Sequence, residues 1–269
     1  MHLDFALILT VLTLASGLIW LVDRLFFARR RRERLAQGKA DRDIEPKVVE
    51  YARSFFPVLL LVLLFRSFLF EPFKIPSGSM IPTLWIGDFI LVNKYAYGLR
   101  LPVLNSKMLE VSDPKRGEVI VFRYPEDPRI NYIKRVIGEP GDQVSYRNKV
   151  LYINGEPIEQ ESLGRWVGEG LNRNVPGTRP ELLQELLADD PHEIVIYPES
   201  VERGLNRQSW EVPEGHYFVL GDNRDQSLDS RSFGFVPEEN LVGRAVMIWM
   251  HWDCGRGCVD WRRIGDRIN

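Results

Sequence analysis

The run Phe55-Phe56-Pro57-Val58-Leu59-Leu60-Leu61-Val62-Leu63-Leu64-Phe65 is entirely apolar, and Pro76-Ser77-Gly78-Ser79-Met80-Ile81-Pro82 follows it closely. The wider stretch Ser54 to Phe73 contains only two charged residues, Arg66 and Glu71, and both lie near one end. About 20 apolar residues suffice to cross a bilayer, and an arginine near the end of a span can reach the headgroups. A buried core helix of a soluble protein is the alternative, but this run has no polar face. The sequence predicts a transmembrane helix over 54–73, which places Ser79 at the membrane surface.

Another apolar stretch, Phe5 to Val22, lies near the start of the sequence. It carries no charge and would be about 27 Å long as a helix, enough to span a bilayer. A cleaved signal peptide begins with positive residues, whereas Met1-His2-Leu3-Asp4 is not positive and the arginines follow the apolar run. We therefore expect a retained membrane anchor over 1–22.

Basic residues separate the two apolar stretches. Loops rich in Lys and Arg remain in the cytoplasm, so we predict a cytoplasmic loop over 23–53, with both termini and residues 74–269 across the membrane. In a bacterium, that is the periplasmic side of the inner membrane. A nucleic-acid-binding arm is the alternative, but the position between two spans disfavours it. The net charge of -2 and pI near 6.2 also give no global attraction to nucleic acid. The basic residues are Arg24, Arg29, Arg30, Arg31, Arg32, Arg34, Lys39, Arg42, Lys47 and Arg53.

Beta-strand signals dominate after Pro76. β-Branched and aromatic runs bounded by Gly, Pro or Asp predict strands, and Arg147-Asn148-Lys149 separates two of them as in a hairpin. We expect a mainly β catalytic core over 74–155 and 211–269, antiparallel and partly closed. Residues 156–210 are polar and rich in Glu, Gly and Pro, which predicts an inserted cap region with one short helix over 180–187. The predicted strands are 88–93, 118–124, 130–137, 143–146, 150–153, 217–220 and 241–250.

Ser79 and Lys134 are the residues that indicate chemistry. A serine hydroxyl is a weak nucleophile until a base removes its proton, and lysine is such a base only when its amine is neutral. Burial lowers a lysine pKa, and Lys134 lies in the apolar run Tyr132-Ile133-Lys134-Arg135-Val136-Ile137. Alternation along a strand predicts that Lys134 points inward and Arg135 outward. Taken singly, Lys134 is also compatible with a solvated lysine on an edge strand, and Ser79 with an ordinary turn serine.

Together with Gly221-Asp222-Asn223-Arg224-Asp225-Gln226-Ser227-Leu228-Asp229-Ser230-Arg231, these stretches closely resemble the conserved blocks of bacterial type I signal peptidases. The resemblance covers residues 54–142 and 213–250. It implies that Ser79 is the nucleophile and Lys134 the general base. It further implies an oxyanion hole formed by the Ser79 N–H and the Ser77 hydroxyl. The remaining implied roles are orientation of the lysine by Ser227, a structural ion pair between Asp229 and Arg231, and bracing of the turn by Met80.

The resemblance also implies a reaction and its partners. The expected reaction is endoproteolysis of the signal peptides of exported preproteins, after small residues, through an acyl-enzyme on Ser79. Extended segments such as Glu71 to Ile75 and Asp127 to Ile133 are able to pair with a peptide backbone. We expect contact with membrane lipids, no nucleic acid partner, no cofactor and a monomeric protein.

Other chemistries fit the sequence less well. No Gly-x-Ser-x-Gly motif accompanies the four histidines, His2, His192, His216 and His251. The segment Asp225 to Asp229 lacks the glycine and glutamate of a calcium loop. His251, Cys254 and Cys258 would give a zinc ion only three ligands, so a disulfide between the two cysteines or free thiols are the alternatives, and of these we prefer the disulfide.

Two other functional classes remain open from the sequence. A soluble autoprotease of the repressor type also uses a Ser–Lys pair, but usually carries a DNA-binding domain where this chain has two membrane spans. An inactive, membrane-tethered β module that binds export partners is disfavoured by the presence of both Ser79 and Lys134.

Overall fold

The computed structural model divides the chain into two compact units. One comprises Met1–Phe70 and Leu99–Leu109, and the other comprises Glu71–Gly98 and Glu110–Asn269. The residues described are 5–29, 31, 33, 45–100, 107–109, 111–174, 177–188, 190–200, 209–253 and 258–268.

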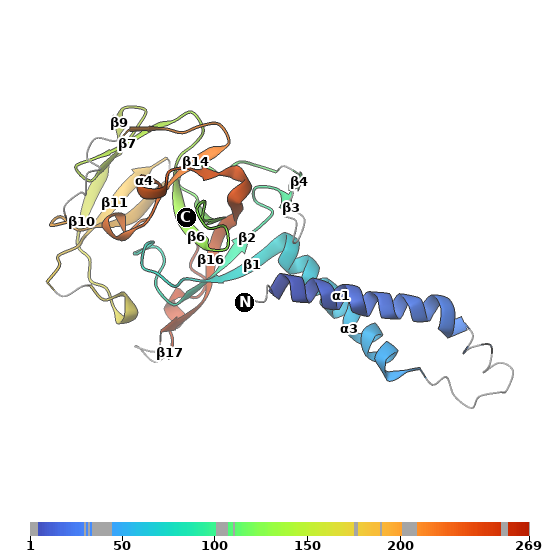
Figure 1. Cartoon of the computed structure of the whole chain (residues 1–269). Helices are drawn as coiled ribbons and strands as arrows, with labels where there is room; N and C mark the ends of the chain where they lie inside the picture. The colour runs from blue at the N-terminus through green and yellow to red at the C-terminus, as the bar shows by residue number, and fades with distance from the viewer. Residues whose placement is uncertain are drawn as a thin grey trace. The chain divides into compact units, whose positions relative to one another are not determined.

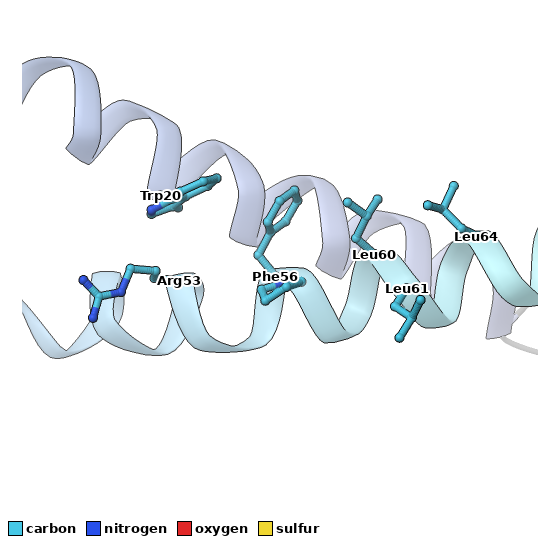
Figure 2. A pocket seen from close by; sticks show the side chains of 7 residues that line it. Trp20, Arg53, Phe56, Leu60, Leu61 and Leu64 are labelled. Atoms are coloured by element: carbon cyan, nitrogen blue, oxygen red, sulfur yellow. The ribbon is translucent and has the colours of Figure 1, made fainter.

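The first unit is built on two long helices that run side by side (Figure 1). Helix α1 (Phe5–Val22) continues into a π-helical turn (Asp23–Phe27), and α3 (Lys47–Leu64) continues into another (Phe65–Leu69). A Cβ on Gly17 would lie 2.6 Å from the Phe56 ring, so the missing side chain lets the helices approach closely. Trp20 and Phe56 meet between the helices, beside a groove of about 390 Å³ (Figure 2). Both helices are long and apolar enough to cross a membrane, over Leu7–Phe27 and Lys47–Ser67.

The helix boundaries differ from the prediction. α3 begins at Lys47 rather than at residue 54, directly after Pro46, whose φ of -57° and ψ of 135° place it outside the helix. The helical segment ends at Leu69, and Phe70–Lys74 forms strand β1 rather than the end of a span. The reason is tertiary, because β1 pairs with β2 of the main sheet. The first helix also continues beyond residue 22 through the turn that ends at Phe27.

The second unit contains the main sheet, whose strand order is β1-β2-β16-β5-β6-β14-β15 with β17 on β16. The registers described within it are antiparallel. The predicted mainly β, antiparallel architecture is therefore confirmed. The strands are β1 (Phe70–Lys74), β2 (Asp88–Asn93), β5 (Val119–Arg123), β6 (Asn131–Gly138), β14 (His216–Leu220), β15 (Val236–Pro237), β16 (Leu241–Asp253) and β17 (Cys258–Val259).

Smaller sheets complete the architecture. The predicted hairpin is confirmed as β7 (Gln143–Arg147) and β8 (Val150–Ile153). Asn148 and Lys149 at its turn have φ values of 50° and 64°, the left-handed region that tight hairpins require. The remaining elements are β3 (Leu99–Arg100) with β4 (Lys107–Leu109), β9 (Glu156–Pro157), β10 (Gln160–Arg165), β11 (Glu181–Leu187), β12 (Asp190–Ile196), β13 (Ser209–Glu211) and helix α4 (Ser230–Phe233).

The helix predicted over 180–187 is wrong. These residues form β11, the central strand of the sheet β10-β11-β12 in the predicted cap region. Leu183, Glu185 and Leu187 alternate with more exposed neighbours and are buried, which is strand periodicity. Leucine and glutamate favour helices intrinsically, but pairing with a strand on each side overrides that preference.

Candidate active site

The turn that carries Ser79 is anchored in the core of the main sheet. At its start, the Ile75 N–H donates to the Asp88 carbonyl at 2.8 Å. Within it, the Leu84 N–H donates to the Met80 carbonyl at 2.8 Å, and both of these side chains are completely buried. Met80 follows Ser79 directly, so the apolar anchor fixes the backbone of the serine, whose side chain stays partly exposed.

Strand β6 places Lys134 against Ser79. Lys134 pairs with Ile120 of β5 in the sheet register, and only 4% of it is exposed. Its Nζ donates to Ser79 Oγ at 2.7 Å and to the Ile133 carbonyl at 2.8 Å. The structure therefore brings the two predicted residues into direct hydrogen-bonding contact from positions far apart in the sequence.

Burial sets the protonation of this lysine. Removal from water lowers the pKa of Lys134 from 10.5 to about 8, while the charges of Asp229 and Asp222 act in the opposite direction. An amine with a pKa near 8 is neutral in a substantial fraction of molecules at mildly alkaline pH. Lys134 can therefore accept the proton of Ser79, which an ordinary surface lysine cannot do.

Arg135 does not point to solvent as predicted. It lies on the opposite face of β6 from Lys134, but that face is also covered, and only 1% of Arg135 is exposed. Its Nε and Nη2 donate to Asp222 at 2.9 and 2.8 Å, and Thr83 Oγ1 donates to the same carboxylate at 2.5 Å. Strand alternation predicted the direction of the side chain correctly but not the second layer that covers it.

The segment from Gly221 to Arg231 holds the serine turn. The Asn223 N–H donates to the Ser79 carbonyl at 3.1 Å, and Asn223 Nδ2 donates to the Gly78 carbonyl at 3.0 Å. Asp229 accepts from Arg231 Nε at 2.9 Å and Nη2 at 2.8 Å, so these two residues form an ion pair in the structure. Asp229 also accepts from the Gly221 N–H at 3.2 Å, so the ion pair is bonded to the strand end beside the site.

Ser227 and Ser77 are close to the site, but their predicted roles remain predictions. Ser227 Oγ is buried and has no hydrogen-bond partner among the described residues, Lys134 included. Its proximity to the site follows from Gly221, whose hypothetical Cβ would lie 2.2 Å from Ser227 Oγ and 2.4 Å from the Ser79 carbonyl oxygen. Ser77 is exposed, two residues before Ser79.

Of the described histidines, His251 and His216 have hydrogen-bond partners other than Ser79. His251 Nδ1 lies 2.7 Å from Asp88 Oδ1, and His216 Nδ1 lies 2.9 Å from the Glu214 carbonyl. Burial lowers the pKa of His192 to about 4, and its Nε2 is 3.4 Å from Glu185. Within the described ranges, no group of three or more His, Cys, Asp or Glu side chains could hold a metal ion. The proposed pairing of Cys254 with Cys258 lies outside the described residues, because Cys254 is not among them.

The sequence gives no structural role to four residues that shape the site. The sequence offers no signal for a role of Asn223, for a pairing of Asp222 with Arg135, or for a contact made by Thr83. Each depends on contacts between segments separated by tens of residues, for which a single sequence carries no periodic signal. The available signal is the density of polar residues from Gly221 to Arg231, directly after the apolar strand 217–220.

Comparisons with known proteins point to one family. The family model described as "Signal peptidase, peptidase S26" matches residues 48–252. A signal peptidase I of Pseudomonas fluorescens is 49% identical, with 94% of each chain covered, and that of Pseudomonas aeruginosa is 46% identical with the same coverage. A crystal structure of a signal peptidase I from Enterococcus faecalis is 33% identical, covering 50% of this chain and 98% of that chain with a TM-score of 0.30.

The fold and the site define a serine peptidase, which is a hydrolase. The chain belongs to the signal peptidase family, peptidase S26. Family membership and the two apolar helices fit a protein of the inner membrane.

Substitution of Gly221 by alanine should reduce peptidase activity by on the order of 100-fold while the protein remains folded. The new Cβ would overlap the Ser79 carbonyl oxygen and Ser227 Oγ, so the backbone of Ser79 must move. Steady-state kcat/KM and the thermal midpoint would be measured together. Gly215→Ala is the control, since its Cβ meets nothing within 4 Å and only its φ of 68° is strained. Equal losses of activity in both variants would contradict the prediction.

Proposed function

We propose that this chain is a membrane-bound endopeptidase that removes signal peptides from exported preproteins through a Ser79–Lys134 dyad. The observation that carries the proposal is the 2.7 Å contact between Ser79 Oγ and the Nζ of a lysine that is 4% exposed and has a pKa near 8. Membership of the signal peptidase family supports the substrate class.

Catalysis would begin with transfer of the Ser79 proton to neutral Lys134 as Oγ attacks the scissile carbonyl. The Ser79 N–H and the Ser77 hydroxyl would stabilise the developing oxyanion, a contribution of about 3–4 kcal/mol for one donor. Lys134 would then protonate the leaving amine, and a water activated by the same lysine would hydrolyse the acyl-enzyme. Because the neutral fraction of Lys134 grows as the pH passes its pKa of about 8, the rate should rise with pH through that value.

Substrate position and membrane topology complete the proposal. The peptide would bind in extended form next to β1 and the residues 127–133, with small side chains at the first and third positions before the cut. The basic loop 23–53 would remain in the cytoplasm, with both termini and the catalytic unit on the periplasmic side. This arrangement would present Ser79 to preproteins that emerge across the membrane. We propose a monomer that contacts lipid and needs no nucleic acid.

Cleavage of a purified preprotein by the full chain in detergent tests this function. Ser79→Ala and Lys134→Ala should each lose on the order of 10⁴-fold or more in kcat, because neither half of the dyad acts alone. Lys134→Arg should be equally inactive, since a guanidinium is always charged. Ser112→Ala and Lys115→Ala are matched controls. Both residues are exposed, and both variants should cleave the preprotein normally.

Two outcomes would contradict the proposal. Cleavage that survives Lys134→Ala would place the base elsewhere. Absence of any cleavage by the intact chain would favour a tethered binding module instead. The orientation is tested separately by protease protection of sealed inverted vesicles, in which residues 74–269 should resist digestion.

A further inference from the structure

The cap region, residues 156–210, is bonded to the segment that holds the serine turn. We call Asp222–Asp225 the holding segment, because Asn223 within it donates to the backbone carbonyls of Gly78 and Ser79. The Val195 N–H in strand β12 donates to the Asp222 carbonyl at 2.9 Å, and the Tyr197 N–H donates to Asp225 Oδ2 at 2.7 Å. The holding segment therefore has the cap region on one side and the nucleophile turn on the other.

The cap region also contacts the nucleophile turn directly. Ile81, two residues after Ser79, is buried in one cluster with Val195 and Tyr197. The Ile86 N–H donates to Asn172 Oδ1 at 2.8 Å, and Asn172 is only 4% exposed. The rings of Trp85 and Trp166 also meet edge to face, with centroids 6.3 Å apart. These apolar and polar contacts thus join the cap region to the turn that carries Ser79.

A buried ion pair joins β11 of the cap region to the holding segment. Arg224 is 1% exposed and Glu185 is completely buried. Arg224 Nη1 donates to Glu185 Oε1 at 2.8 Å, Nη2 donates to Oε2, and Gln160 Nε2 donates to Oε1 at 2.9 Å. Burial alone would raise the pKa of the Glu185 carboxyl, but the charge and hydrogen bonds of Arg224 outweigh it and lower the pKa. The pair is therefore ionised, and its planar two-bond geometry fixes Arg224 in direction as well as distance.

We propose that the cap region positions the nucleophile, and that Glu185 is its positioning residue, acting through Arg224 and the neighbouring Asn223 on the backbone of Ser79. This inference rests on the proposed function. Glu185 bonds to Arg224 and Gln160, not to Ser79 or Lys134, so it takes no part in proton transfer. Its loss should therefore lower kcat while the KM for the peptide and the pH midpoint of the reaction stay unchanged.

The double variant Glu185→Leu/Arg224→Met separates positioning from stability. Removing one partner alone would leave a buried charge and unfold the cap, whereas replacing both with apolar residues of similar volume commonly preserves stability. We expect the double variant of the full chain to keep a thermal midpoint near that of the unsubstituted protein. Its kcat should fall by about 10- to 100-fold, because the reacting oxygen is displaced. Adding Asn223→Ala should cause little further loss, because both changes act along one route.

Glu193→Leu is the matched control, because Glu193 is an exposed glutamate on the adjacent strand. This substitution should change neither the thermal midpoint nor kcat. A double variant with the thermal midpoint and the kcat of the unsubstituted protein would overturn the inference. The proposed Ser79–Lys134 dyad would not be affected by that result. If the double variant does not fold, Asn172→Ala and Asn172→Asp provide the test. Asn172→Ala removes the acceptor for the Ile86 N–H and should lower kcat without changing KM. Asn172→Asp keeps an acceptor oxygen and should have a kcat near that of the unsubstituted enzyme. Native kcat in folded Asn172→Ala would overturn the inference. Failure of the proposed function itself would show in the unsubstituted enzyme and in Ser79→Ala.

Discussion

Substitution of Lys134 by methionine should abolish peptide cleavage and, below pH 8, stabilise the folded protein by about 3 kcal/mol. In the proposed mechanism, the activity is lost because Ser79 no longer has a group that accepts its proton. The stability is gained because the structure buries the lysine so completely that its pKa falls from 10.5 to about 8. Methionine fills a similar volume without a charge to desolvate.

The pH dependence of this gain has a definite sign. Between pH 8 and 10.5 the unfolded chain binds the Lys134 proton more tightly than the folded chain, so the stability of the unsubstituted protein rises with pH in that window. Lys134→Met has no such proton, and its advantage should therefore shrink as the pH rises from 8 towards 10.5. Thermal unfolding in detergent, followed by tryptophan fluorescence at several pH values, measures this. A variant that is less stable at pH 7, or an advantage that does not change with pH, would contradict the assignment.

Asp222→Ala should destabilise the second unit by about 3–5 kcal/mol. The substitution leaves the Arg135 guanidinium buried without its carboxylate, and Thr83 loses its acceptor. Arg135 and Asp222 have side chains that are 2% and 1% exposed, so water does not replace the missing partner. The measurement is the free energy of unfolding from denaturant titration.

A double substitution tests whether the loss comes from the unpaired charge. Arg135→Met/Asp222→Leu removes both charges and should recover most of the lost stability, as replacing buried pairs with apolar residues often does. Asp127→Ala breaks an ion pair with Arg129 at 2.7 Å whose arginine is exposed, and should leave the unfolding midpoint unchanged. An Asp222→Ala variant as stable as Asp127→Ala would show that the pair contributes nothing.

Most elements that could be predicted from the sequence have a local signal. The strand over 88–93 and the hairpin at Asn148 follow from β-branched runs and turn residues, and both are present. The strand Glu181–Leu187 was mistaken for a helix because its leucines fit either periodicity and its intrinsic preference is helical. The choice between helix and strand is made by the cap sheet, in which this segment pairs with residues 160–165 and 190–196.

The sequence by itself determined the two apolar helices and the β-rich character of the rest, and it singled out Ser79 and Lys134 as the candidate reactive pair. Each of these follows either from the composition of one segment or from the resemblance to the sequence blocks of a family. Only the tertiary structure decided that Arg135 is buried against Asp222, that Asn223 holds the backbone of Ser79, and that Glu185 reaches this segment through Arg224. The physical reason is that burial and ion pairing depend on which distant segments cover a strand, whereas periodicity reports only the two faces of the strand itself.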